Sequence, residues 1–125
     1  MKRPLILIVD DDVLGLQLAS ALLVRHGVEC VTASSGTQAI SLLRSQSVDA
    51  VISDLHMGGM DGLQLLGTVR AMKELSGLPV AIVTADLCLA DSTAAAIGAL
   101  GATLSCGVLF EDDLLALARR LLRPT

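Results

Sequence analysis

Short, continuous apolar runs alternate along the sequence with longer segments whose apolar residues recur at helical spacing. The run at residues 5–9 is apolar at every position, which is typical of a strand that is buried on both faces. Such strands belong to parallel sheets, because the crossover helices of β-α units cover both faces of the sheet. The alternation therefore predicts a doubly wound α/β domain with a parallel sheet between two helical layers.

Five β-α units can be placed along the chain. The strands are predicted at residues 5–9, 29–33, 48–53, 79–84 and 102–106. The helices are predicted at residues 13–25, 37–45, 62–73, 91–100 and 112–122. Typical N-cap residues introduce the first three helices: Asp12, then Ser34 or Ser35, then Asp61. This order predicts one domain over residues 1–125, which is either the whole protein or the N-terminal part of a longer one.

The composition excludes several classes of function. At 53% hydrophobic residues the chain can bury a core, whereas its net charge of −4 disfavours direct binding of nucleic acid by this domain. No apolar run reaches the roughly 18 residues that a membrane span needs, and the N-terminus lacks a signal-peptide pattern. We therefore expect a cytoplasmic domain without membrane contact, in which Cys30, Cys88 and Cys106 are small buried residues in their reduced form.

Polar residues stand where the predicted strands end. Asp10 and Asp11 follow the first strand, Asp54 follows the third, and Thr84 closes the fourth. Ligands of open α/β sheets bind beyond the carboxyl ends of the strands, so we expect these side chains to meet. Three carboxylates in one crevice repel each other unless a cation lies between them, and oxygen ligands favour Mg²⁺ or Mn²⁺. The pattern predicts a metal site at which a carboxylate could attack phosphorus and form an acyl phosphate.

Several motifs make the chain similar to the receiver domains of bacterial two-component response regulators. These are Ile8-Val9-Asp10-Asp11-Asp12, Ile52-Ser53-Asp54-Leu55-His56-Met57, Met60-Asp61-Gly62, Val83-Thr84-Ala85 and Leu100-Gly101-Ala102. The resemblance extends over essentially the whole chain. It implies a flavodoxin-like, three-layer α/β/α fold with a five-stranded parallel sheet in the order 2-1-3-4-5.

The resemblance also implies a role for each residue of the predicted site. Asp54 matches the phosphoacceptor, which would receive its phosphoryl group from a histidine kinase or a phosphotransfer protein. Asp10 and Asp11 match the metal-binding acidic pair, and Asp11 is the expected direct ligand. His56 matches the residue whose backbone carbonyl completes the metal shell, and Thr84 matches the switch hydroxyl. In family members, side chains at the positions of His56 and Asp86 tune dephosphorylation.

The chain departs from the family pattern near its fifth strand. Family members carry a lysine followed by proline there, whereas Val108 and Leu109 take these positions and no lysine occurs after Lys73. Ser105 is expected at the position of the switch aromatic residue. Gly58 replaces a proline in the loop beside the phosphoacceptor, which predicts a more flexible loop.

Three hypotheses for the function follow. The first is a phosphoacceptor receiver domain that signals and is not an enzyme. The second is a degenerate receiver that acts as a phosphorylation-independent interaction module, and the third, less favoured, is a hydrolase with an aspartyl-phosphate intermediate. The last helix bears a broad apolar arc, which predicts either deep burial or a homodimer contact through Leu114, Leu115, Leu117, Ala118, Leu121 and Leu122.

Overall fold

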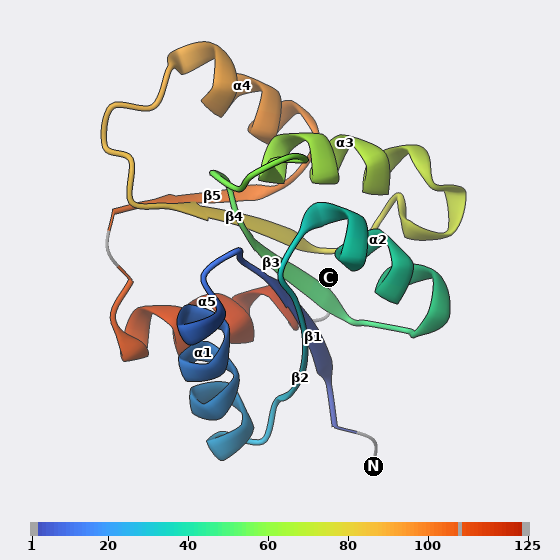
Figure 1. Cartoon of the computed structure of the whole chain (residues 1–125), viewed down its shortest axis with the longest axis vertical. Helices are drawn as coiled ribbons and strands as arrows, with labels where there is room; N and C mark the ends of the chain where they lie inside the picture. The colour runs from blue at the N-terminus through green and yellow to red at the C-terminus, as the bar shows by residue number, and fades with distance from the viewer. Residues whose placement is uncertain (1–2, 108, 124–125) are drawn as a thin grey trace.

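The computed structural model describes residues 3–107 and 109–123, and it confirms the doubly wound α/β architecture (Figure 1). All strand pairs are parallel, and the sheet order is β2-β1-β3-β4-β5, as predicted. The strands are β1 (Leu5–Val9), β2 (Glu29–Ala33), β3 (Ala50–Asp54), β4 (Val80–Thr84) and β5 (Thr103–Cys106).

The helices lie in two layers, with α1 and α5 on one face of the sheet and α2, α3 and α4 on the other (Figure 1). Their bounds are α1 (Val13–Arg25), α2 (Gly36–Ser45), α3 (Gly62–Ala71), α4 (Asp91–Ala99) and α5 (Glu111–Leu121). The predicted third helix is too long, because the backbone is extended at Met72 and a short 3-10 turn, η1 (Lys73–Leu75), follows. No glycine or proline marks this break in the sequence.

The continuous apolar sequence of β1 reflects a core on both sides of the sheet. Leu7 and Val9 belong to the cluster under α2, α3 and α4, whereas Ile6 and Ile8 belong to the cluster under α1 and α5. These four side chains are at most 5% exposed. Burial of successive residues on opposite faces explains why the strand carries no polar position.

The apolar arc of α5 lies deep in the core cluster under α1 and α5. Its central members Leu115, Leu117, Ala118 and Leu121 are buried, and Leu114 and Leu122 pack against the same cluster. Self-association through this arc is therefore not supported, since its side chains already contact the sheet and α1. The burial of this arc, one of the two predicted alternatives, is confirmed. The expectation of buried cysteines is wrong in part, because Cys88 and Cys106 are exposed.

Arg70 connects two segments of the chain at the edge of the sheet that lies opposite Asp54. The half-buried guanidinium extends from the end of α3 and donates to the carbonyl of Leu100 at 2.6 Å and to that of Leu78 at 2.7 Å. Leu100 caps the end of α4, and Leu78 precedes β4. One side chain thus satisfies two carbonyls from separate segments.

None of the helices in the described part of the chain combines the length and the apolar character that crossing a bilayer requires.

Candidate functional site

Three carboxylates meet at the carboxyl edge of the sheet. β1 and β3 are neighbours, so Asp10 and Asp11, which follow β1, lie beside Asp54 at the end of β3. One carboxylate oxygen from each of the three residues lies within 4.8 Å of the others. The structure therefore brings together the three residues that the sequence predicts, and we call them the acidic cluster.

Backbone donors orient two of these carboxylates. Asp10 Oδ1 accepts a hydrogen bond from the Asp12 amide at 3.0 Å, and Asp11 Oδ2 accepts one from the Gly58 amide at 3.4 Å. The second bond connects the loop after β1 with the loop after β3. Asp12 stands at the N-cap position of α1, but its side chain makes no capping hydrogen bond, so its predicted capping role is confirmed in position only.

The acidic cluster holds its negative charge at an energetic cost. Burial raises the pKa of Asp54, and the neighbouring charges of Asp10 and Asp11 raise it further. Burial also raises the pKa of Asp10, although the hydrogen bond from the Asp12 amide works in the opposite direction. Both shifts indicate that the ionised pair is destabilised in the folded protein, as expected for carboxylates gathered without a counter-ion.

The donor set of the acidic cluster fits a hard divalent cation. All three side chains offer carboxylate oxygens, which are the ligands that Mg²⁺ and Mn²⁺ prefer. The exposed side of Asp11 leaves room for the water molecules that Mg²⁺ retains. A cation here would also offset the repulsion that raises the pKa of Asp54.

We expect Mg²⁺ to raise the melting temperature by several degrees at neutral pH and to lose this effect near pH ~4. The folded-state pKa values of Asp10 and Asp54 are raised, so the stability contributed by these groups is complete below their unfolded pKa. It is lost as the pH rises through their folded pKa, and at neutral pH a cation compensates for that loss. Thermal melts with and without Mg²⁺ across this pH range measure the effect.

The matched variants for this prediction are Asp11→Asn and Asp12→Asn. Asp11 belongs to the acidic cluster, so its amide variant should remove most of the stabilisation by Mg²⁺. Asp12 is the exposed neighbour outside the cluster, and its amide variant should retain the response. Equal responses in the two variants, or a melting temperature that Mg²⁺ does not change at neutral pH, would contradict a metal site here.

Thr84 lies at the same edge of the sheet, at the end of β4. Its side chain is 3% exposed, and its Oγ1 accepts a hydrogen bond from the Asp86 amide at 3.1 Å. The Thr84 carbonyl accepts a hydrogen bond from the Gly107 amide at 2.8 Å, which connects it to the end of β5. The hydroxyl is thus held at the start of the β4–α4 loop, beside the strand that carries Asp54.

His56 and Asp86 connect the two loops that flank the site. His56 Nε2 lies 3.3 Å from Asp86 Oδ2, and the second carboxylate oxygen of Asp86 accepts a hydrogen bond from the Cys88 amide at 2.9 Å. The resemblance names His56 and Asp86 together as positions that tune dephosphorylation, but it gave no sign of their contact. This contact bridges the segment after Asp54 and the segment after Thr84.

Among the described residues, no lysine lies at this edge of the sheet. Lys73 follows α3, which runs away from Asp54, so it stands at the opposite edge. Val108, which the resemblance places at the lysine position, lies outside the described residues. Within β5, Cys106 pairs with Thr84 and Ser105 pairs with Val83, so Cys106 is the β5 residue beside the threonine.

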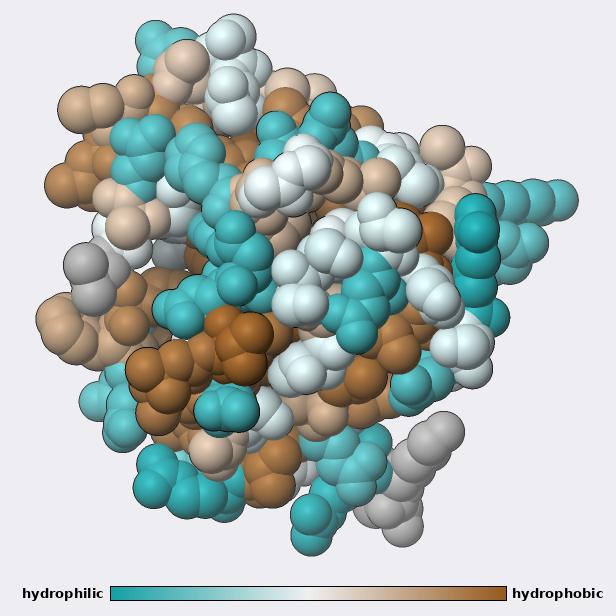
Figure 2. Space-filling model, viewed as in Figure 1, coloured by the Kyte–Doolittle hydropathy of each residue, from teal (hydrophilic) through white to brown (hydrophobic). Residues whose placement is uncertain are grey.

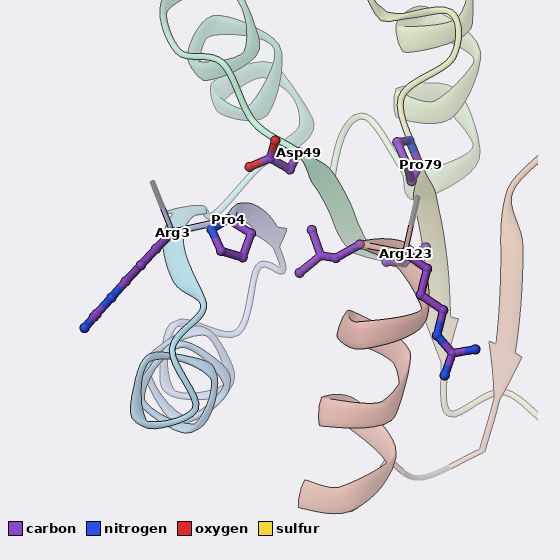
Figure 3. Close-up of a pocket in the computed structure, with 7 residues that line it drawn as sticks. Arg3, Pro4, Asp49, Pro79 and Arg123 are labelled. Atoms are coloured by element: carbon purple, nitrogen blue, oxygen red, sulfur yellow. The ribbon is translucent and has the colours of Figure 1, made fainter. Parts of the chain in front are cut away.

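A separate cavity of about 370 Å³ lies at the opposite edge of the sheet (Figure 3). Pro4, Asp49, Pro79 and the end of α5 line it. Arg3 and Arg123 flank this cavity, but Figure 3 shows their guanidinium groups pointing away from each other. The two arginines therefore do not converge on a shared anion, and the acidic cluster remains the candidate site.

Comparison with known proteins decides the family. The model of the response regulator receiver domain matches residues 6–103, a span that includes the acidic cluster and Thr84. The chain belongs to the response regulator receiver domain family. Receiver domains are phosphoacceptor modules of two-component signalling that bind Mg²⁺ at an acidic pocket, and the acidic cluster has the composition of such a pocket.

Relatives and solved structures agree with this assignment. The receiver domain is 41% identical over 90 residues to the "Transcriptional regulatory protein GlrR" of Escherichia coli, covering 72% of this chain and 20% of that protein. It is 37% identical over 87 residues to the rice "Two-component response regulator ORR8", covering 69% of this chain and 72% of that protein. The chain thus spans only about a fifth of the length of relatives such as GlrR.

A chemotaxis response regulator has a similar fold over nearly the whole length of this chain. The structure of CheY4 from Vibrio cholerae superposes with a TM-score of 0.88 at 26% identity, covering 97% of this chain and all of the other. The receiver family match ends at Thr103, at the start of β5. The segment that lacks the expected lysine therefore follows the matched region.

Proposed function

We propose that this receiver domain accepts a phosphoryl group on Asp54 from a histidine kinase or a histidine-containing phosphotransfer protein. The observation that carries the proposal is the gathering of Asp54 with Asp10 and Asp11 at the carboxyl edge of a parallel sheet. Among the three, Asp54 ends the strand nearest to Thr84. We place the activity in the cytoplasm of a bacterium, in a two-component or phosphorelay pathway.

In the proposed reaction, an Asp54 carboxylate oxygen attacks phosphorus. The new O–P bond forms while the N–P bond to the donor imidazole breaks, and the leaving nitrogen keeps the bond's electron pair and takes up a proton. Asp10, Asp11 and Asp54 would hold the metal, together with the backbone carbonyl of His56. A bound Mg²⁺ would supply positive charge that offsets the negative charge of the carboxylates and of the incoming phosphoryl group. The phosphoryl group then serves as a signal and is not the intermediate of a hydrolase.

Thr84 would report the presence of the phosphoryl group. Its hydroxyl now accepts a hydrogen bond from the Asp86 amide and retains its proton for donation. Donation to a phosphoryl oxygen on Asp54 would draw Thr84 and the loop after it toward β3. The contact between His56 and Asp86 couples that loop to the loop after Asp54, so the two would move together.

Incubation with acetyl phosphate and Mg²⁺ tests the proposal directly. We expect the intact mass to increase by one phosphoryl group and the Asp54→Asn variant to gain none, because an amide oxygen is a poor nucleophile at phosphorus. Asp12→Asn, at the same edge but outside the acidic cluster, should be modified like the parent. Phosphorylation that persists in Asp54→Asn, or its absence from the parent with both small donors and kinase, would refute the assignment.

A further inference from the structure

The helix α1 presents an apolar stripe to solvent. Val13, Leu14, Leu18 and Val24 are 57, 63, 64 and 47% exposed, and Ala21 is exposed between them. No charged residue occurs between Val13 and Val24. Figure 2 shows a brown patch over α1. We call Val13, Leu14, Leu18, Ala21 and Val24 the α1 stripe. Because contiguous apolar surface is uncommon on monomeric proteins, the α1 stripe indicates contact with another polypeptide.

The exposed apolar surface continues onto the start of α5. Phe110, the only aromatic residue in the sequence, directly precedes α5 and is 73% exposed. Together with Leu18 and Leu114 it lines a cleft of about 300 Å³ between α1 and α5. The two helices lie side by side in one layer, so their outer surfaces form one face of the molecule (Figure 1).

The outer face of α5 carries opposite charges at its two ends. Asp112 and Asp113 lie in the first turn, Arg119 and Arg120 lie in the last turn, and all four are exposed. Ala116, also exposed, stands midway between them. The helix dipole favours an acidic start and a basic end in any helix. It does not require, however, that these residues be evenly placed about a small residue on the solvent face.

This charge pattern is complementary to itself. When two α5 helices pack antiparallel about a two-fold axis at Ala116, Asp112 of one copy faces Arg119 of the second copy, because at 100° per residue both lie on the same side of Ala116. Asp113 faces Arg120 of the second copy in the same way, on the other side of Ala116. A two-fold axis makes both pairs twice. The small side chain of Ala116 allows the helices to approach closely.

We propose that α1 and α5 form a self-association face on which a second copy of this chain docks. The α5 helices lie antiparallel about Ala116. The α1 stripe and Phe110 supply the apolar surface that becomes buried between the two copies. The occupant is a second copy because the charges of α5 match their own reversed order. This face differs from the apolar arc of α5, which is in the core. It includes no residue of the acidic cluster, so it does not depend on the proposed phosphorylation.

Charge reversals on α5 test the proposal by sedimentation velocity over a wide range of concentration. Asp112→Arg and Arg119→Asp each place like charges opposite one another, so each should weaken the dimer by about tenfold. The double variant should recover association, and so should a mixture of the two single variants. Asp112 and Arg119 are about two turns apart, beyond the reach of side chains within one helix. Recovery can therefore arise only between copies.

The matched control is Arg44→Asp on α2, an exposed charge reversal in the other helical layer, which should leave association unchanged. Leu18→Gln should weaken the dimer, and circular dichroism should show that each variant folds. A chain that stays monomeric at millimolar concentration, or a dimer that neither single reversal affects, would overturn the proposal. A monomer in which Leu18→Gln slows transfer from a histidine-bearing phosphodonor would also overturn it and would assign the α1 stripe to that donor.

Discussion

Gly62→Ala is expected to destabilise the domain by about 1 to 3 kcal/mol and to weaken its response to Mg²⁺. A Cβ atom at this position would press into the backbone carbonyl oxygen of Asp54 and would lie 3.0 Å from the Cα of Leu55. The Gly62 amide donates to the Leu55 carbonyl at 2.9 Å, so the start of α3 is fixed against the end of β3. Backbone atoms cannot avoid the added Cβ by a rotamer change, as side-chain atoms can. The backbone of Asp54 must therefore shift.

Gly36→Ala is the matched comparison. A Cβ atom at Gly36 would also meet close neighbours, but these belong to the flexible side chain of Met60, the nearest being its sulfur at 2.7 Å. Met60 Cβ would lie 2.9 Å away, and a rotamer change does not move it, so the segment around Met60 must shift. Asp54 need not move, so we expect an unchanged response to Mg²⁺. Urea denaturation measures both variants. An equal loss of the response to Mg²⁺ in the two variants would show that close packing of α3 on β3 does not fix Asp54.

The sequence predicted the fold well because its signals were local. A strand that is apolar at every position, such as β1, has few alternatives to a sheet covered on both faces. The acidic cluster was predictable for a related reason, since the ends of neighbouring parallel strands must lie at one edge. Asp10, Asp11 and Asp54 needed no further information than their place in the strand order.

The features that the sequence did not reveal depend on tertiary geometry. The bridge between His56 and Asp86 depends on the paths of two loops, which no local pattern specifies. The pairing of Thr84 with Cys106 depends on a sheet register that no local pattern in the sequence specifies. The breadth of the apolar arc on α5 did not show whether neighbouring elements cover it, and in the structure they do.

Placing a cation beside the phosphoacceptor should increase the rate of phosphorylation by acetyl phosphate about tenfold to a hundredfold. The expected variants are Val108→Lys, at the position implied by the resemblance, and Cys106→Lys, beside Thr84 in the β5 register. An ammonium group near the phosphoryl oxygens forms charge-assisted hydrogen bonds that strengthen as negative charge develops. Cys106 is exposed, so a lysine there keeps most of its hydration.

Gln46→Lys serves as the control for added charge, because Gln46 is exposed just after α2, at the edge opposite Asp54. Time courses of intact mass give the rates, and thermal melts show whether each variant is folded. If both Val108→Lys and Cys106→Lys fold yet react no faster than Gln46→Lys, a missing cation does not limit the reaction. If none of these chains accepts phosphate, the phosphorylation-independent interaction module becomes the better description.

The hydrogen bonds of Arg70 attach one end of α4 to the rest of the domain more firmly than the other end. The guanidinium holds the Leu100 carbonyl at the end of α4, whereas Ala90 at its start makes no side-chain capping hydrogen bond. The start of α4 is also the end nearest to Thr84 along the chain. A displacement of the loop after Thr84 would therefore rotate α4 about its C-terminal end, which Arg70 holds in place. The orientation of the outer surface of α4 would then depend on the phosphorylation state of Asp54.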